Sequence, residues 1–82
     1  MARVEWRRVA ADGSVWAADP EPAYHLAAWS DDGWYHGDWH VLDPAGNVLA
    51  RADGERLSNA GITRVRAEEA YRALVAPRGI VH

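Results

Sequence analysis

The chain has 82 residues, a formal net charge of −3 at pH 7 and no cysteine. This length predicts a single α+β domain over residues 1–82, with no room for a second core. The lack of cysteine excludes disulfides, thiolate metal ligands and cysteine nucleophiles. Every basic side chain is arginine and alanine is abundant, which indicates a GC-rich genome, so an actinobacterium or one of its phages is the expected source.

The N-terminal third predicts two short strands joined by a tight turn. A first strand is predicted over residues 3–9, because Val4 and Trp6 alternate with Glu5 and Arg7, which is the pattern of a half-buried strand. Asp12-Gly13 favours a reversal, because glycine tolerates positive φ and aspartate bonds to nearby backbone. The second strand, over 15–18, should end at Asp19-Pro20-Glu21-Pro22, since proline fixes φ and cannot donate to a strand ladder.

The middle of the chain predicts an antiparallel meander. Its strands are expected over 23–29, 34–42 and 48–52, separated by the turn sequences Ser30-Asp31-Asp32-Gly33 and Asp43-Pro44-Ala45-Gly46-Asn47. Pro44 suits the second position of a type I turn, and Gly46 can take a left-handed conformation. In the first of these strands the pattern does not decide whether Leu26 or Trp29 faces inward.

The last quarter of the chain changes to a helical period. Thr63 is the predicted N-cap, and apolar residues then recur at helical spacing at Ala67, Ala70, Tyr71, Leu74 and Val75. The predicted fold is thus a twisted antiparallel sheet of four or five strands, with one C-terminal helix packed on one face. Its predicted core consists of Val4, Trp6, Leu26, Tyr35, Trp39, Val41, Leu49, Ala70, Tyr71, Leu74 and Val75.

The stretch 29–42 holds most of the side chains that could carry chemistry. Read as a strand, it places Tyr35, Gly37, Trp39 and Val41 on one face and His36, Asp38 and His40 on the other. Imidazole and carboxylate groups bind divalent metals. These three residues, with His25 from the neighbouring strand, therefore form a candidate metal site, and no other cofactor is expected. The alternative is a solvated polar face, because three such residues span about 13 Å along one strand.

A second set of residues predicts a binding surface for a protein or a cationic ligand. It consists of Trp29, Asp31, Asp32, Trp34, Arg51 and Arg56. Tryptophan and arginine dominate protein-interface hot spots, and ring faces attract cations. The alternative is that these rings belong to the core, as a small cysteine-free domain requires.

The arginines also raise the possibility of a DNA-binding sheet-plus-helix domain. However, the chain is acidic overall and has no continuous basic stripe, so nucleic acid is not the expected partner. We find neither a nucleophile elbow nor a glycine-rich phosphate loop, which argues against an enzyme.

The favoured function is a small non-enzymatic accessory or regulatory protein that binds another protein through its aromatic and arginine side chains. Metal binding and DNA binding are the alternatives. An uncovered outer strand would also permit a homodimer. Because no stretch approaches the roughly 20 apolar residues of a membrane span, and the N-terminus has no apolar leader, a cytoplasmic protein without a membrane partner is expected.

Overall fold

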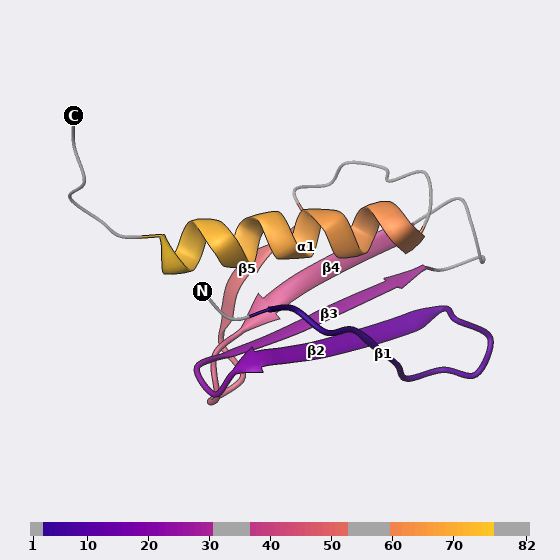
Figure 1. Cartoon of the computed structure of the whole chain (residues 1–82), viewed down its shortest axis with the longest axis horizontal. Coiled ribbons are helices and arrows are strands. Elements are labelled where there is room, and N and C mark those ends of the chain that lie inside the picture. Colours follow the sequence, from indigo (N-terminus) through magenta and orange to yellow (C-terminus); the bar gives the residue numbers. More distant parts are fainter. Residues whose placement is uncertain (1–2, 31–36, 53–59, 77–82) are drawn as a thin grey trace.

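The computed structural model describes residues 3–30, 37–52 and 60–76. They form a five-stranded antiparallel sheet with one helix lying across one of its faces (Figure 1). The elements are β1 (Arg7–Arg8), β2 (Val15–Glu21), β3 (Tyr24–Ser30), β4 (Gly37–Leu42), β5 (Val48–Arg51) and α1 (Ala60–Val75). Each strand pairs with its neighbour in sequence, in the order β1-β2-β3-β4-β5. The predicted α+β meander with a C-terminal helix is therefore confirmed.

Two predicted turns form as their residues suggest. Gly13 and Gly46 have φ angles of 79° and 88°, which glycine adopts without steric cost. The carboxylates of Asp12 and Asp43 accept hydrogen bonds of 2.8 to 3.0 Å from backbone N–H groups within their own turns. The Gly46 N–H also donates to the carbonyl of Asp43 at 3.0 Å, which closes a turn around Pro44. Local side-chain chemistry thus sets both reversals.

Strands β1 and β2 differ from the prediction. β1 is shorter than the expected 3–9, whereas β2 continues through Asp19 and Pro20, where a break was predicted. The pairing register shifts between Ala18 and Glu21, so that Asp19 and Pro20 lie opposite the single residue His25. Such a bulge leaves the proline nitrogen out of the ladder, and the strand resumes beyond it.

The helix begins earlier than predicted. It starts at Ala60, so Thr63 lies inside its first turn and is fully buried, and the N-cap prediction is wrong. Thr63 lies one helical turn before Ala67, on the same buried stripe. A polar side chain at this position is typical of an N-cap, and the apolar pattern begins only one turn later, which is why the sequence predicts too late a start for the helix.

The core lies between α1 and the sheet. Its buried members are Ala18, Leu26, Ala28, Trp39, Val41, Ala67 and Tyr71, with half-buried Val4, Trp6, Ala70, Leu74 and Val75 packed around them. Leu49 is 40% exposed, which corrects its predicted core position, and Tyr35 lies outside the described residues. Ala70 was predicted as core, whereas Ala18, Ala28 and Ala67 were not. Alanine side chains are short, so they let the helix approach the sheet closely. In a sequence pattern, however, alanine is only a weak hydrophobic signal.

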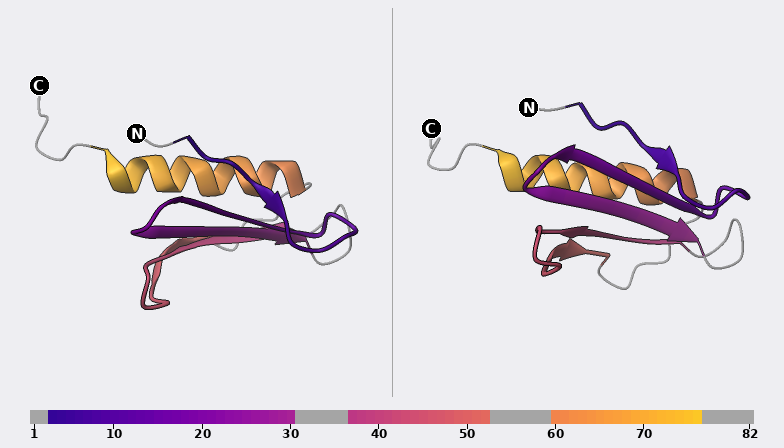
Figure 2. Two further views of the ribbon diagram at one scale, coloured as in Figure 1. Left: turned by 60° about the horizontal axis from the view of Figure 1, so that its bottom comes forward. Right: turned by 90° about the horizontal axis from the view of Figure 1, so that it is seen from below.

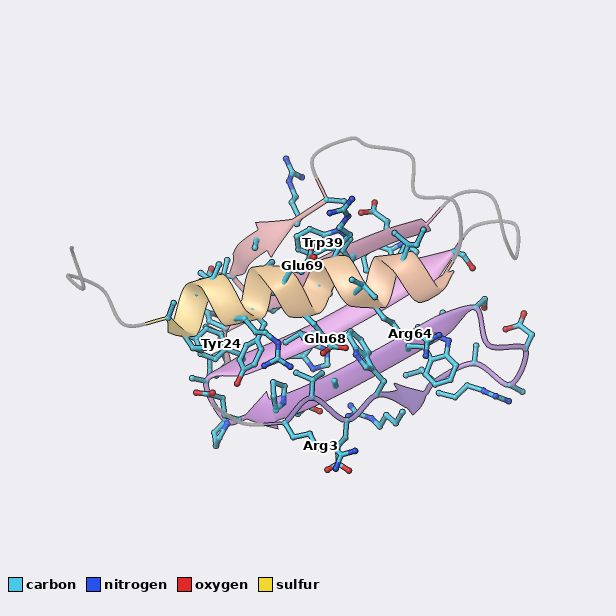
Figure 3. The ribbon with its side chains drawn as sticks, turned by 45° about the horizontal axis from the view of Figure 1, so that its top comes forward. Arg3, Tyr24, Trp39, Arg64, Glu68 and Glu69 are labelled. Carbon is cyan, nitrogen blue, oxygen red and sulfur yellow. The ribbon has the colours of Figure 1, made fainter. Side chains whose placement is uncertain are left out.

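Polar contacts connect the helix to the N-terminal part of the chain, and Figure 3 shows Arg64 and Glu68 on the side of α1 that faces this part. The hydroxyl of Tyr71 donates to Glu21 at 2.6 Å, and Nε1 of Trp6 donates to Glu68 at 2.8 Å. The guanidinium carbon of Arg64 lies 4.1 Å from the centre of the Trp16 ring, a cation–π distance. Burial, with the bond to Glu21, raises the pKa of Tyr71 to about 12, so its hydroxyl remains a donor. Within the described residues, no helix has the length and apolarity needed to cross a bilayer.

Candidate functional site

No helix of the described residues lies on the second face of the sheet. In Figure 2, α1 covers one side of the strands, and no described helix or strand packs over the opposite side. Along β3, Leu26 and Ala28 are buried towards α1, whereas His25, Ala27 and Trp29 alternate with them and are only half-buried. We call this second side the outer face. The sequence left open whether Leu26 or Trp29 faces inward, and the structure shows that Leu26 does.

Strand register arranges the outer face in three rows that cross the sheet. The rows are Val15-Trp29-Asp38, Arg7-Ala17-Ala27-His40-Arg51 and Asp19-His25-Leu42-Val48. The middle row has alanines at its centre, so the middle of the face carries short side chains. Rings and charges lie around this centre, and two hollows open among them.

The first hollow, which we call the Trp29 hollow, has a volume of 230 Å³. Its walls are Trp29, Asp38, Trp39, His40, Val48, Arg51 and Ala52. The Trp29 and His40 rings meet edge to face, with centroids 4.9 Å apart, and Arg51 lies directly opposite His40 in the β4–β5 register. Trp29 and Arg51, two members of the predicted binding set, therefore line one cavity. Asp31, Asp32, Trp34 and Arg56 lie outside the described residues.

Arg51 differs from the other arginines on the described strands and helix. Arg7, Arg66 and Arg72 form ion pairs with carboxylates, and Arg8 and Arg64 lie over the Trp16 ring. Arg51 is exposed and has no ion pair with any described residue. Its guanidinium is therefore not engaged by this part of the chain and can bind an incoming group.

His40 contributes a neutral ring to the Trp29 hollow. Partial burial lowers the pKa of His40 below its usual value of 6.5, and the nearby His25 lowers it further, while Asp38 acts in the opposite direction. A neutral imidazole both donates and accepts a hydrogen bond. The Trp29 hollow thus combines an aromatic wall, the guanidinium cation of Arg51 and the His40 imidazole, which has one hydrogen-bond donor and one acceptor.

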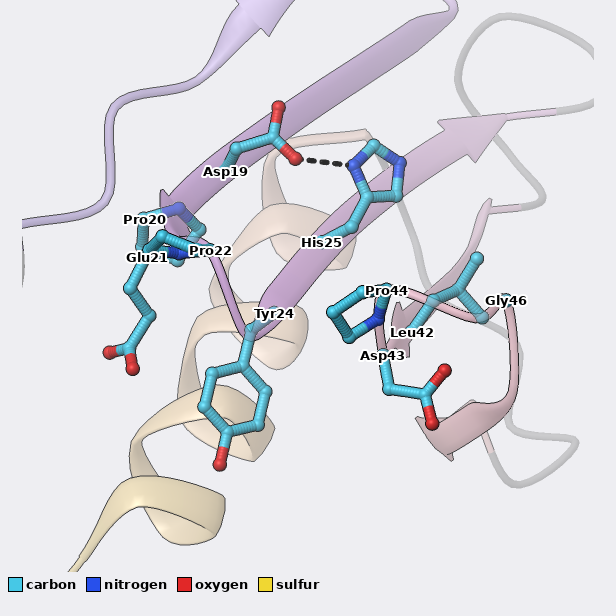
Figure 4. A pocket seen from close by; sticks show the side chains of 10 residues that line it. All are labelled: Asp19, Pro20, Glu21, Pro22, Tyr24, His25, Leu42, Asp43, Pro44 and Gly46. Carbon is cyan, nitrogen blue, oxygen red and sulfur yellow. Dashed lines mark hydrogen bonds and ion pairs between the residues drawn. The ribbon is translucent and has the colours of Figure 1, made fainter.

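The second hollow, which we call the end hollow, has a volume of 610 Å³ and lies where the β2–β3 and β4–β5 turns meet (Figure 4). It is lined by Asp19, Pro20, Glu21, Pro22, Tyr24, His25, Leu42, Asp43, Pro44 and Gly46. Nδ1 of His25 lies 2.6 Å from Asp19, whose other oxygen lies 2.8 Å from Arg7. The bond from His25, assisted by Arg7, lowers the pKa of Asp19 below 3.8.

Sequence reasoning missed the end hollow. It identified the two Asp-Pro segments, Asp19-Pro20 and Asp43-Pro44, only as breaks and turns. The predicted topology nevertheless indicated that these two turns lie close together. In an antiparallel meander the β2–β3 and β4–β5 turns lie at the same end of the sheet, so their side chains come together.

The candidate metal ligands are only partly brought together. Asp38 and His40 share the outer face of β4, and His25 lies diagonally across on β3, where it is engaged by Asp19. Among the described residues, no group of three or more histidine, aspartate or glutamate side chains could hold a metal ion. His36 lies outside them, so a metal site that depends on it stays a prediction.

Among the residues that the structure describes, the arginines considered for DNA binding do not form one stripe. Arg7 and Arg51 lie at opposite edges of the outer face, whereas Arg8 and Arg64 gather around Trp16 on the helix side. Arg66 on α1 is paired with Glu69. A phosphate backbone needs a continuous row of cations, which this arrangement does not supply.

Comparisons of the chain with protein-family models, with curated proteins and with solved structures found no match. Function is therefore inferred from the geometry of the outer face.

Proposed function

We propose that the protein is a small non-enzymatic binding module, with an accessory or regulatory role, that holds a segment of another protein against its outer face. The observation that carries this proposal is the Trp29 hollow, where an indole, a neutral imidazole and an unengaged arginine meet on a face that no described element covers. Tryptophan and arginine dominate interface hot spots. The cytoplasmic location favoured by the cysteine-free composition belongs to the same proposal.

The chemistry of the hollow indicates what it would accept. Trp29 and Val48 offer apolar contact, and a volume of 230 Å³ suits a single anchoring side chain. The guanidinium of Arg51 would bind a carboxylate or carbonyl oxygen beside that anchor, since its planar donors match such acceptors. The expected anchor is therefore an apolar or aromatic side chain with an acceptor next to it.

Site-specific photo-cross-linking tests the proposal. A photoreactive residue is placed at Val48, which is 55% exposed on the outer face, or at Val65, which is 53% exposed on α1. The two positions are matched in residue type and exposure. In lysate of the source organism, one protein should cross-link from Val48 and not from Val65. Equal capture from both positions, or capture only of a second copy of the chain, would contradict the proposal.

Binding of the captured protein, once purified, should then depend on the Trp29 hollow. Trp29→Ala and Arg51→Ala are each expected to weaken binding by about tenfold or more, as hot-spot truncations do. Arg66→Ala, which removes an arginine paired on the helix, is the control and should change affinity little. Isothermal titration calorimetry gives the comparison, and equal effects of all three substitutions would place the interface elsewhere.

A further inference from the structure

We infer that the end hollow receives an arginine or lysine side chain from the same partner segment whose anchor lies in the Trp29 hollow. This inference rests on the proposed function and adds the charge and the spacing of the motif that the partner presents.

Charge complementarity selects a cation. The end hollow is lined by the carboxylates of Asp19, Glu21 and Asp43, and by no arginine or lysine. Only Asp19 is next to a described cation, Arg7. Glu21 accepts from a tyrosine hydroxyl, and Asp43 accepts from backbone and amide N–H groups of its turn. Neutral donors orient a carboxylate without cancelling its charge, so the hollow remains negative.

The walls suit the stem of such a side chain. Three prolines, Leu42 and the ring of Tyr24 line the hollow between the carboxylates (Figure 4). Arginine and lysine bury their methylene groups along apolar surface while the charged head reaches polar groups. A tyrosine ring adds a face on which a guanidinium can stack. Because proline fixes φ, this wall is held in shape before the ligand arrives.

The positions of the two hollows set the spacing of the motif. His25 lines the end hollow and Trp29 lines the other. The two residues are four positions apart on β3, which corresponds to about 13 Å along the strand. Ala27 lies between them on β3, beside Ala17, so an extended chain can lie across the middle of the face. An extended partner segment would then place its basic residue four positions from its anchor, because both side chains must point to the same side.

Heteronuclear NMR on the isotope-labelled full chain tests the cation site. The probe is Nα-acetyl-arginine amide, and Nα-acetyl-citrulline amide is the matched neutral probe of the same shape. The arginine probe should shift the backbone amides of Tyr24, His25 and Gly46 in a saturable way, and the citrulline probe should not. Equal shifts with both probes, or shifts confined to other parts of the chain, would overturn the inference.

A pair of charge-removing variants sharpens the test. Asp43→Asn should weaken binding of the arginine probe by about threefold or more, because it removes one of three carboxylates. Asn keeps the oxygen that accepts from the backbone N–H groups of Ala45 and Asn47, and it loses only the acceptor for the Asn47 side chain. Asp12→Asn is the control, since Asp12 also caps an exposed turn through backbone bonds and does not line the hollow. Equal effects of the two variants would overturn the inference. If Asp43→Asn alters the spectrum of the whole domain, Glu21→Gln takes its place.

The inference and the proposed function fail separately. Capture of a partner from Val48 without binding of the arginine probe would overturn the inference alone. Binding of the probe in the end hollow without capture from Val48 would support the cation site and contradict the protein-binding function.

Discussion

Trp29 and Trp39 lie on neighbouring strands of one sheet and face opposite sides. Trp39 pairs with Ala28, points towards α1 and is 8% exposed, whereas Trp29 pairs with Asp38 on the outer face and is only half-buried. Because side chains alternate along a strand, a shift of one residue in register would exchange the two faces. Register, not residue type, therefore decides which indole stabilises the fold and which is available for binding.

The two faces also differ in what packs against them. On the covered side, Tyr71 bonds to Glu21 and Trp6 bonds to Glu68, so that helix and strands hold each other. On the outer face, Arg51 has no ion pair with a described residue and lines the Trp29 hollow. The contacts of α1 thus lie on one side of the sheet, and no described helix or strand packs on the other.

The largest expected effect is on the covered side. Trp39→Ala should lower the free energy of unfolding by about 3–5 kcal/mol, since it removes a buried ring and leaves a cavity. Chemical denaturation followed by circular dichroism measures this change. A loss below about 1 kcal/mol would mean that the ring under α1 does not hold the core together.

Trp29→Ala should have a much smaller effect on folding. Its ring is only partly removed from water, so we expect a loss of about 1–1.5 kcal/mol, near half the value of a fully buried side chain. The same denaturation experiment applies. If this variant is as unstable as Trp39→Ala, both faces of the sheet belong to one core and the contrast between them disappears.

Tyr71→Phe probes the bond that ties the helix to β2. Loss of the hydroxyl that donates to Glu21 at 2.6 Å should cost about 0.5–1.5 kcal/mol of unfolding free energy. Tyr24→Phe is the natural control, because the Tyr24 ring packs edge-on against Tyr71 while its hydroxyl has no bond to a described residue. Thermal melts of both variants give the comparison, and equal changes would show that the hydrogen bond contributes nothing.

The smallest expected effect is the pH response of His40. Because its pKa in the folded protein lies below 6.5, the folded state binds fewer protons there than the unfolded state. This contribution to stability is present above pH 6.5 and is lost as the pH falls through the folded pKa. NMR titration of the imidazole gives the pKa directly, and a value at or above 6.5 would contradict the expectation that burial and His25 outweigh Asp38. In His40→Gln this part of the pH dependence should vanish.

Much of the fold could be read from local patterns. The alternation around Trp39 predicted an extended strand with its indole inward, and β4 has this geometry. The spacing of Ala67, Tyr71 and Leu74 predicted the face that α1 turns to the sheet. Errors arose where a distant contact outweighed a local preference. Pro20 is accommodated in β2 by a bulge opposite His25, and Thr63 is buried inside the helix.

The candidate site could be predicted from local sequence patterns only in part. Trp29 and Arg51 were predicted as binding residues from their types, but their shared hollow depends on the pairing of β3 with β4 and of β4 with β5. The end hollow depends on two turns that are far apart in the chain. No pattern within one turn indicates a neighbour that is contributed by another hairpin.

Turns, strand alternation and helical period follow from preferences that act over a few residues, so the amino-acid order alone was enough to predict an antiparallel meander and a C-terminal helix. The docking of α1 on one side is a different matter, because it depends on long-range packing of alanines from β2, β3 and the helix. That docking left Trp29, His40 and Arg51 on the uncovered side. It was therefore the assembled fold, through the free energy of burying one face, that separated the core from the proposed binding surface.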